Sequence, residues 1–377
     1  MSDKLTQREQ NNALRTLSIS NKGIDFASND YLGFAQSETI FDQTHAYLID
    51  HDIKINGATG SRLLSGNHNL YQITEDFIAR FHQTEAAIIF NSGYDANVGF
   101  FSAVPQRNDV IFYDELCHAS IRDGIQMGHA KAYKFAHNDF EELENSIQKI
   151  STTSAQIPVI YIVTESVFSM DGDTPNLEEL VLLSEKYNCY LIVDEAHSVG
   201  VFGQNGEGVI QSTQLQNSIF ARIVTFGKGL GCHGAAILGS DELKDYLVNF
   251  ARSFIYTTGL SPHAVATILI AYQQLSAEKA ALQQLKQNIQ FFNQYKMQLG
   301  LKSIFVYSKS AIQCAIIPGN HKVKTIATSF QQAGFDVKPI LSPTVPEGQE
   351  RLRFCLHSFN SEQEIADVLQ LLATFVF

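Results

Sequence analysis

The chain has 377 residues, 45% of them apolar and 18% charged, and its formal net charge is −12. A chain of this length and composition can bury a sizeable core spread over two or three lobes, whereas its acidic balance and scattered basic residues argue against nucleic-acid binding. The polar N-terminal segment lacks the apolar core of a signal peptide, and no apolar run approaches the length that spans a bilayer, so a cytoplasmic location is predicted.

The cysteines are odd in number and widely spaced: Cys117, Cys189, Cys232, Cys314 and Cys355. They form no C-x-x-C pair and no Cys/His cluster with the spacing of a zinc site. Reduced, mostly buried thiols and no metal site are therefore predicted.

Alternating helical and strand patterns begin near Asn67. The first is a helical pattern whose apolar positions share one face: Leu70, Ile73, Phe77, Ile78 and Phe81. Short β-type runs follow, with helical patterns such as Leu177–Tyr187 between several of them: Ala86–Phe90, Val110–Tyr113, Val159–Val163, Tyr190–Val193 and Arg222–Phe226. This alternation predicts an α/β domain in which helices connect the strands of a largely parallel sheet.

Beyond Ser261 and Pro262 a long helical stretch runs through Gln298. Shorter alternating pieces and a final helix from Ser361 come after it, and together they predict a smaller α+β lobe. We therefore expect three parts: an N-terminal arm over residues 1–45, a large α/β domain over 46–275 and a small C-terminal α+β domain over 276–377.

The turn after Ala86–Phe90 contains Ser92, Gly93 and Tyr94 and leads into a helix. Ligands of open α/β sheets collect at the carboxyl ends of the strands, and the first N–H groups of a helix can bind phosphate. These three residues are candidate phosphate ligands, although an ordinary βα turn has the same pattern.

His118 follows the run Val110–Tyr113, at a position where an imidazole can stack on a planar cofactor. A lone histidine is more often a surface residue or a hydrogen-bonded core residue. The adjacent Cys117 suggests a Cys/His nucleophile, but neighbours in the chain rarely point at each other, so Cys117 is assigned to packing.

Asp194, Glu195, Ala196 and His197 follow the run Tyr190–Val193, and such an acidic strand end also occurs in helicase-type ATPases. An ATPase needs a phosphate loop, and the chain contains no G-x-x-x-x-G-K-[ST]. A buried carboxylate at this position can instead keep the pyridine nitrogen of pyridoxal phosphate (PLP) protonated, so that the ring acts as an electron sink. Asp194 is predicted for this task, and His197 for a contact to the ring hydroxyl.

Lys228 lies between two glycines directly after the run Arg222–Phe226. A lysine removed from water has a lowered pKa, which makes its amine available for imine formation and for proton abstraction. The alternative is a solvated loop lysine. The spacing Gly229-x-Gly231-x-x-Gly234 also matches a dinucleotide fingerprint, but the helix and the distant acidic residue that this motif requires do not follow it.

Several motifs occur in a fixed order along nearly the whole chain: SNDYLG from Ser28, GATGSRLLSG from Gly57, AHND from Ala136, TESVFSMDGD from Thr164, DEAHSVG from Asp194, TFGKG from Thr225 and PTVPEGQERLR from Pro343. In these segments the chain resembles the α-oxoamine synthase family of PLP-dependent enzymes. The resemblance implies a fold-type I transferase with a mostly parallel central sheet flanked by helices, a smaller C-terminal domain and an N-terminal arm.

The resemblance also implies a role for each residue of the cofactor site. Lys228 is expected to form the Schiff base with PLP, Asp194 to pair with the pyridine nitrogen and His118 to stack on the ring. His197 is expected to contact the ring oxygen, supported by Ser169. The phosphate is expected to be held by Ser92, Gly93, Tyr94 and Thr225. Thr257 or Thr258, supplied by the second subunit of a homodimer, is expected to complete the phosphate site.

By the same resemblance, Arg353 is expected to clamp a substrate carboxylate with two parallel hydrogen bonds, and Asn29 to line the substrate entrance. Arg351 is the weaker candidate for the clamp. Where some family members carry a basic residue ahead of the PTVP segment, this chain has Leu341 and Ser342.

The expected reaction is the decarboxylative condensation of L-alanine with a pimeloyl thioester of CoA or acyl-carrier protein, in biotin biosynthesis. Three other activities of the family differ in amino acid and acyl chain but not in cofactor residues: those of glycine C-acetyltransferase, 5-aminolevulinate synthase and serine palmitoyltransferase. A different class of function is a catalytically silent scaffold subunit. Such chains lack the lysine, so the presence of Lys228 together with Asp194 and His118 argues against this alternative.

Overall fold

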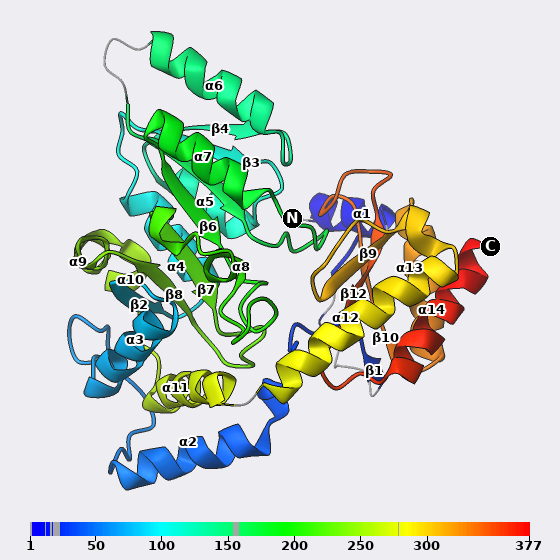
Figure 1. Ribbon diagram of the computed structural model, residues 1–377, viewed down its shortest axis with the longest axis horizontal. Helices are drawn as coiled ribbons and strands as arrows, with labels where there is room; N and C mark the ends of the chain where they lie inside the picture. Colours follow the sequence, from blue (N-terminus) through cyan, green and yellow to red (C-terminus); the bar gives the residue numbers. More distant parts are fainter. Residues whose placement is uncertain (1, 12, 16, 18–22, 154–157, 278) are drawn as a thin grey trace. The chain divides into compact units, whose positions relative to one another are not determined.

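The computed structural model describes residues 2–11, 13–15, 17, 23–153, 158–277 and 279–377 (Figure 1). The chain divides into two compact units. The sheet unit consists of Phe34–Phe168 and Thr174–Lys279. The terminal unit consists of the residues up to Gly33, the short segment Ser169–Asp173 and Ala280–Phe377.

This division differs from the predicted arm over residues 1–45, and the difference has a structural cause. The strand β1 (Ile24–Asp25) pairs in parallel with β10 (Phe335–Asp336), which makes this part of the predicted arm a component of the terminal unit. Helix α2 (Glu38–Asp50) belongs instead to the sheet unit. The arm residues 1, 12, 16 and 18–22 lie outside the described residues.

The sheet unit is built on a seven-stranded sheet with the order β2-β8-β7-β6-β5-β3-β4. Its strands are β2 (Ala86–Phe90), β3 (Val110–Asp114), β4 (Lys131–Phe135), β5 (Ile160–Glu165), β6 (Tyr190–Asp194), β7 (Ala221–Thr225) and β8 (Ala235–Gly239). All neighbouring pairs are parallel except those that involve β8, which is antiparallel to both β2 and β7. The carboxyl ends of the other six strands therefore lie at one edge of the sheet.

Helices cover both faces of this sheet (Figure 1). The helices of the sheet unit are, in chain order, α2 (Glu38–Asp50), α3 (Asn69–Phe81), α4 (Gly93–Ala103), α5 (Ala119–Met127), α6 (Phe140–Thr153), α7 (Leu177–Tyr187), α8 (Val209–Ser212), α9 (Asp241–Phe250), α10 (Arg252–Ile255) and α11 (Pro262–Ala277), with 3₁₀ turns at Phe34–Gln36 and Gln216–Ser218. Alternate strand residues point to opposite faces. Ile192 packs in one core with side chains of α4 and α5, whereas Leu191 and Val193 pack in a second core with α6 and α7.

The antiparallel strand β8 departs from the simple pattern of parallel strands joined by helices. It follows β7 after the glycine-rich connection 226–234, which contains no helix. A parallel neighbour would need a crossover connection, whereas a short connection returns the chain antiparallel. The segment that carries Lys228 is therefore a short loop at the end of the sheet.

The terminal unit contains a three-stranded antiparallel sheet with the order β11-β12-β9. Its elements are α1 (Ser2–Gln10), β1 (Ile24–Asp25), α12 (Ala280–Gln298), a 3₁₀ turn at Leu301–Ile304, β9 (Ile312–Ile316), α13 (Asn320–Gln332), β10 (Phe335–Asp336), β11 (Lys338–Ile340), β12 (Arg351–Cys355) and α14 (Glu362–Val376). Helix α14 begins with a capping box between Ser361 and Glu364, which satisfies N–H groups that the first turn leaves without acceptors.

Two predictions for individual helices need correction. The predicted helical stretch through Gln298 forms two helices, α11 and α12, that belong to different units. On α3, Ile73 is 40% exposed, because the buried face is centred on Thr74 and Glu75. The Glu75 carboxylate is buried there with two cations, Arg62 and Lys244.

Within the described residues, no helix is both long and apolar enough to cross a membrane. The cytoplasmic location stays a prediction.

Candidate active site

Polar side chains follow several strands at the shared carboxyl edge of the large sheet. Strands β3, β5 and β6 end with Asp114, Glu165 and Asp194, and β7 ends with Thr225. Glu165 and Asp194 are paired neighbours in the parallel ladder. This edge therefore concentrates buried acidic groups close to Lys228, which comes three residues after Thr225.

Lys228 and His197 lie next to each other at this edge. The Nζ atom of Lys228 is 2.7 Å from Nε2 of His197, and the histidine is buried. Lys228 is partly buried in the turn after β7. The imidazole therefore fixes the direction in which the lysine amine points.

Asp194 is buried and accepts hydrogen bonds at both carboxylate oxygens. Its Oδ1 accepts from the backbone N–H of Ala196 at 2.9 Å, and its Oδ2 accepts from Nδ2 of Asn97 at 2.9 Å. These contacts hold the Asp194 side chain in one orientation at the sheet edge, where a carboxylate can pair with a protonated ring nitrogen.

His118 is the N-cap residue of α5, and its imidazole is held by Ser120. The Nδ1 atom of His118 lies 2.7 Å from Oγ of Ser120 and accepts from the Ser120 backbone N–H at 3.2 Å. Ser120 Oγ in turn accepts from Nδ2 of Asn97 at 3.0 Å. Burial lowers the pKa of His118, which favours its neutral form.

The predicted phosphate ligands lie at the start of α4. Ser92 is the N-cap residue, and its side chain accepts from the backbone N–H of Asp95 at 3.0 Å and donates to the Asp95 carboxylate at 2.9 Å. Tyr94 points its hydroxyl to Asp123 at 2.8 Å. The side chains of Ser92 and Tyr94 are thus occupied, which leaves the backbone N–H groups of the first turn to bind an anion.

Thr225 and Gly93 approach each other closely. A Cβ atom on residue 93 would lie 2.6 Å from Cγ2 of Thr225, so only glycine fits. The Thr225 hydroxyl donates to the carbonyl oxygen of Ala196 at 3.3 Å. The turn before α4 and the end of β7 therefore form one narrow cradle of backbone and hydroxyl groups.

Thr257 and Thr258 lie beside Asn91 of the same chain, immediately before the phosphate turn. The Nδ2 atom of Asn91 donates to Oγ1 of Thr257 at 3.1 Å and to the carbonyl oxygen of Thr258 at 2.6 Å. This contact fixes the segment after α10, and the supply of either threonine to a second subunit stays a prediction.

Three residues of this network were not singled out by the sequence: Asn97, Ser120 and Glu165. Glu165 is buried, and its Oε1 accepts the backbone N–H of His118 at 2.6 Å. Burial, with a further contribution from the Asp194 charge, raises the pKa of Glu165 to about 8. For Glu165 the sequence did offer a signal, because this carboxylate directly follows an apolar run and lies inside the motif TESVFSMDGD.

Cys117 is buried beside His118, and its sulfur lies 3.7 Å from the carbonyl oxygen of Val163. Burial raises the pKa of its thiol well above the ordinary value, which favours the unreactive thiol form. This environment agrees with the assignment of Cys117 to packing.

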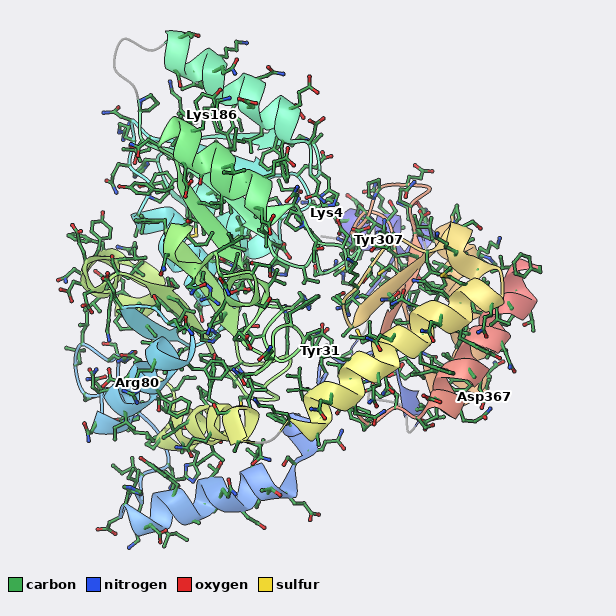
Figure 2. All side chains as sticks on the ribbon, viewed as in Figure 1. Lys4, Tyr31, Arg80, Lys186, Tyr307 and Asp367 are labelled. Carbon is green, nitrogen blue, oxygen red and sulfur yellow. The ribbon has the colours of Figure 1, made fainter. Side chains whose placement is uncertain are left out.

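The predicted substrate residues Arg353 and Asn29 lie in the terminal unit together with Ser169, which is predicted for the cofactor site. Arg353 is buried on β12; its Nε donates to the carbonyl oxygen of Ser169 at 2.8 Å, and one Nη donates to Oδ1 of Asn29 at 2.9 Å. The hydroxyl of the buried Tyr31, labelled in Figure 2, also donates to Asn29 Oδ1, at 3.3 Å. The guanidinium plane is therefore held in one orientation.

Arg351 lies on the same face of β12 as Arg353 but has other partners. Its Nη1 forms an ion pair with Asp171 and donates to the carbonyl oxygen of Met170 at 3.0 Å. Because Asp171 already neutralises its charge, Arg351 is a poorer anion ligand than Arg353.

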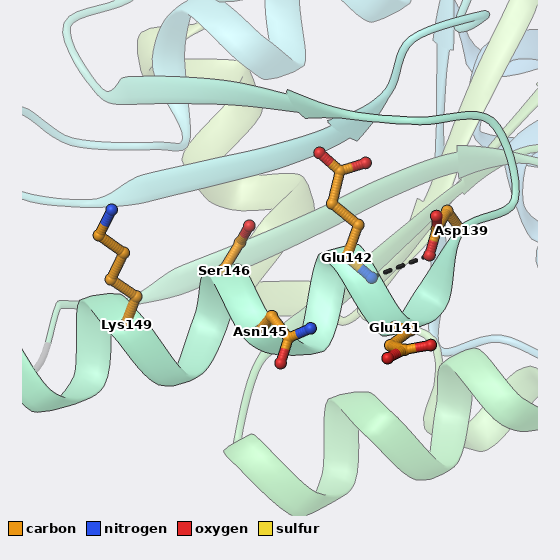
Figure 3. Close-up of a pocket in the computed structure, with 6 residues that line it drawn as sticks. All are labelled: Asp139, Glu141, Glu142, Asn145, Ser146 and Lys149. Carbon is orange, nitrogen blue, oxygen red and sulfur yellow. Dashed lines mark hydrogen bonds between the residues drawn. The ribbon is translucent and has the colours of Figure 1, made fainter.

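A separate hollow of about 400 Å³ lies along α6 (Figure 3). It is lined by Asp139, Glu141, Glu142, Asn145, Ser146 and Lys149, and Asp139 caps the helix by accepting from the backbone N–H of Glu142 at 2.9 Å. Clustered acidic residues on an exposed helix are ordinarily solvated, so this hollow is not a candidate active site.

Comparisons with known proteins agree with this geometry. Residues 21–372 match the family model for aminotransferase class I and II. The 8-amino-7-oxononanoate synthase of Emericella nidulans is 37% identical over 99% of this chain and 94% of its own length. The crystal structure of the Francisella tularensis 8-amino-7-oxononanoate synthase is 30% identical, with a TM-score of 0.78 over 94% of this chain and 98% of that chain.

A serine palmitoyltransferase structure that carries PLP is 26% identical, with a TM-score of 0.86 over 94% of this chain and 87% of that chain. The residues at the sheet edge fit this cofactor, since they supply a carboxylate for a protonated ring nitrogen, an amine for the aldehyde carbon and a helix N-terminus for the phosphate. The chain therefore belongs to the aminotransferase class I and II family and, within it, to the PLP-dependent α-oxoamine synthases related to 8-amino-7-oxononanoate synthase.

Proposed function

We propose that the protein condenses L-alanine with a pimeloyl thioester, presented by CoA or acyl-carrier protein, to give 8-amino-7-oxononanoate, CO₂ and the free thiol. The observation that carries the chemistry is the amine of Lys228 at 2.7 Å from His197, at a sheet edge that also holds Asp194. The choice of substrates is supported by the named relatives, which match this chain over nearly its whole length.

Bound PLP supplies an electron sink for the pair left on the substrate α-carbon. Lys228 would hold the cofactor through its amine and, when that amine is free, would take the Cα proton as a general base. Asp194 would pair with the ring nitrogen, and His197 would orient Nζ of Lys228 and contact the ring oxygen. His118 would stack on the ring.

The phosphate is held by the first turn of α4, through the backbone N–H groups near Ser92, Gly93 and Tyr94. The Thr225 hydroxyl joins them by turning its hydrogen from the Ala196 carbonyl to the phosphate. Thr257 or Thr258 of a second protomer completes this site in a homodimer. Asn91 fixes the position of both threonines within their own chain.

Arg353 binds the carboxylate of the amino acid, with Asn29 beside it. The support for this role is the fixed guanidinium plane, held by the Ser169 carbonyl and Asn29. Ser169 as a further support for the His197 contact rests on the family resemblance alone.

The test is a matrix of amino acids against acyl thioesters, scored by thiol release with PLP present. L-Alanine with pimeloyl-CoA or the pimeloyl carrier protein should give the highest kcat/KM. A preference for glycine or serine with another acyl chain would show that the proposed substrates are wrong, although the proposed type of reaction would stand. Absence of thiol release from every pair, and of a visible absorption band after PLP is added, would instead identify a silent subunit.

A further inference from the structure

Two buried side chains that face no solvent connect Asp194 with His118. The Nδ2 group of Asn97 donates to Oδ2 of Asp194 at 2.9 Å and to Oγ of Ser120 at 3.0 Å. Ser120 Oγ lies 2.7 Å from Nδ1 of His118. Asn97 and Ser120 are 2% and 1% exposed, so water does not compete for these hydrogen bonds.

The close packing of α4 against α5 brings the two residues together. Gly124 of α5 lies directly on α4, and a Cβ atom there would be 2.8 Å from the carbonyl oxygen of Asn97. Only glycine allows this approach without displacement of a helix. Ser120, one turn earlier on α5, is thereby held against the Asn97 side chain.

Each hydrogen bond between Asp194 and His118 has a definite donor and acceptor. The carboxylate of Asp194 only accepts, so the Asn97 amide must turn its NH₂ group toward it, even though its Oδ1 is left without a hydrogen-bond partner among the described residues. The second hydrogen of the same NH₂ group goes to Ser120 Oγ. The Ser120 hydroxyl hydrogen is then available to Nδ1 of His118.

A second donor faces the same nitrogen. The backbone N–H of Ser120 also points at Nδ1 of His118, at 3.2 Å, and a backbone N–H can only donate. With two donors directed at it, Nδ1 carries no hydrogen. A neutral imidazole with this arrangement has its hydrogen on Nε2.

We infer that Asn97 and Ser120 are positioning residues that hold His118 as a neutral imidazole with its hydrogen on Nε2. Burial disfavours the imidazolium form of His118, and so do the positive charges of Lys228 and Arg122. The negative charges of Asp194 and Asp123 favour it. Glu165 accepts the backbone N–H of His118 and so holds its main chain in place. The hydrogen bonds at Nδ1 add to burial and disfavour protonation there.

The importance of this arrangement for turnover rests on the proposed function, whereas the protonation state itself does not. A neutral ring stacked on the cofactor adds no positive charge beside the protonated ring nitrogen, and it keeps Nε2–H as a hydrogen-bond donor. An imidazolium would oppose the proton that Asp194 stabilises.

The experiment is ¹⁵N NMR of histidine side chains in the cofactor-free protein, with the His118 signals assigned from the spectrum of His118→Gln. At pH 7 we expect an Nε2–H signal and an unprotonated Nδ1. Either Nδ1–H or an imidazolium at pH 7 in the unmodified protein would overturn the inference, whatever the enzyme's activity proves to be.

The variant Ser120→Ala removes the hydroxyl but keeps the backbone N–H. We expect the protonation midpoint of His118 to rise by about one pH unit, because a donor to the neutral ring is lost. Ser120→Thr should restore it, and Ser184→Ala, the same substitution at a buried serine bonded to Val181, should leave it unchanged. A midpoint that does not move in Ser120→Ala would remove Ser120 from this role.

Discussion

Lys228 is the residue on which the proposed chemistry depends most directly. Lys228→Ala should lower turnover about a thousandfold or more, since both the covalent attachment of PLP and the general base are lost. Borohydride reduction should then no longer fix the cofactor to the protein. The exposed Lys186→Ala, which removes a surface ion pair with Glu144 and a cation–π contact with Tyr187, should leave both properties unchanged. Full activity with reducible, protein-bound PLP in Lys228→Ala would disprove the assignment.

Arg353 should determine the affinity for the amino acid and not for the cofactor. Loss of a bidentate pair in a partly desolvated pocket costs about 2 to 5 kcal/mol, so Arg353→Ala should weaken L-alanine binding strongly. Arg353→Lys should not restore it, because an ammonium lacks the planar fork. L-Alanine-induced spectral titration of the PLP-loaded variants measures this effect, alongside PLP affinity.

The control for Arg353 is Arg80→Lys on α3, whose exposed side chain is labelled in Figure 2. It should bind L-alanine as the unmodified protein does. Near-normal L-alanine affinity in both Arg353 variants would return Arg353 to a structural role.

Glu165 should make the cofactor-free protein less stable as the pH rises. Burial raises its pKa from 4.5 to about 8, so between these values the folded state keeps a proton that the unfolded state has released. The free energy of unfolding therefore falls as pH increases from 4.5 to 8, by an amount on the order of a few kcal/mol. Glu165→Gln, neutral at every pH and still an acceptor for the His118 N–H, should remove this fall.

Urea unfolding of the cofactor-free protein at pH 5 and pH 8 measures the effect of Glu165. The exposed Glu9→Gln on α1 should show the same pH dependence as the unmodified protein. If Glu165→Gln retained the whole fall, another group would have to be its source.

At the scale of single elements, α12 carries a buried lysine in the terminal unit. Lys296 donates to Oε1 of Gln313 at 2.8 Å and lies 4.9 Å from the ring centre of Phe305. Burial lowers its pKa from 10.5 to about 8, so between these values the unfolded state binds the extra proton and stability rises with pH. Lys296→Met should abolish this rise.

At pH 7, Lys296→Met no longer buries a charge, but it leaves Gln313 without this donor. The two effects oppose each other, and we expect a net gain of at most about 2 kcal/mol in the free energy of unfolding. Chemical unfolding at pH 7 and pH 10 checks both statements, with the exposed Lys322→Met on α13 as control. A lower free energy of unfolding at pH 7, with the same rise in stability between pH 7 and pH 10 as in the unmodified protein, would contradict this account.

Two strands of the large sheet were not predicted from the sequence. Strand β4 is an edge strand with the sequence KAYKF, and its lysines are exposed, so its alternation is faint. Strand β8, with the sequence AAILG, is as long and nearly as apolar as β2, with the sequence AAIIF, so its local pattern does not explain the omission. The strands β2, β3, β5, β6 and β7 were predicted to within a residue or two because each is a nearly continuous buried apolar run.

At the scale of the whole molecule, exposed apolar side chains concentrate between residues 41 and 64 of the sheet unit: Phe41, Ile49, Ile55, Leu63 and Leu64. Leu64, at 86%, is the most exposed of these five side chains. The homodimer proposed above predicts that a second copy of the chain covers this segment. A stable interface of this kind buries about 1,200 to 2,000 Å².

Leu64→Glu should therefore shift the protein toward the monomer in sedimentation velocity and lower its PLP retention. Met297→Glu, the same change at an exposed apolar residue of α12, should leave the association state unchanged. A fully active monomer at assay concentration in the unmodified protein would refute the dimer and, with it, the contribution of Thr257 or Thr258 from a second subunit.

The sequence by itself predicted the family, which the comparisons confirm, and the residues to which the chemistry is assigned. Lys228, Asp194 and His118 each follow an apolar run, and the order of strand, turn and polar residue is local, so it can be recognised without coordinates. The same holds for the phosphate turn before α4.

Only the tertiary structure decided which groups these residues meet. Glu165 reaches the backbone of His118 because β3 and β5 are neighbours in the sheet, and Asn97 joins Asp194 to Ser120 because α4 packs closely on α5. The strand β1 joins β10 although more than three hundred residues separate them in the sequence. Such contacts depend on strand order and helix packing. These are fixed by the burial of apolar surface over the whole chain, and no local sequence pattern encodes them.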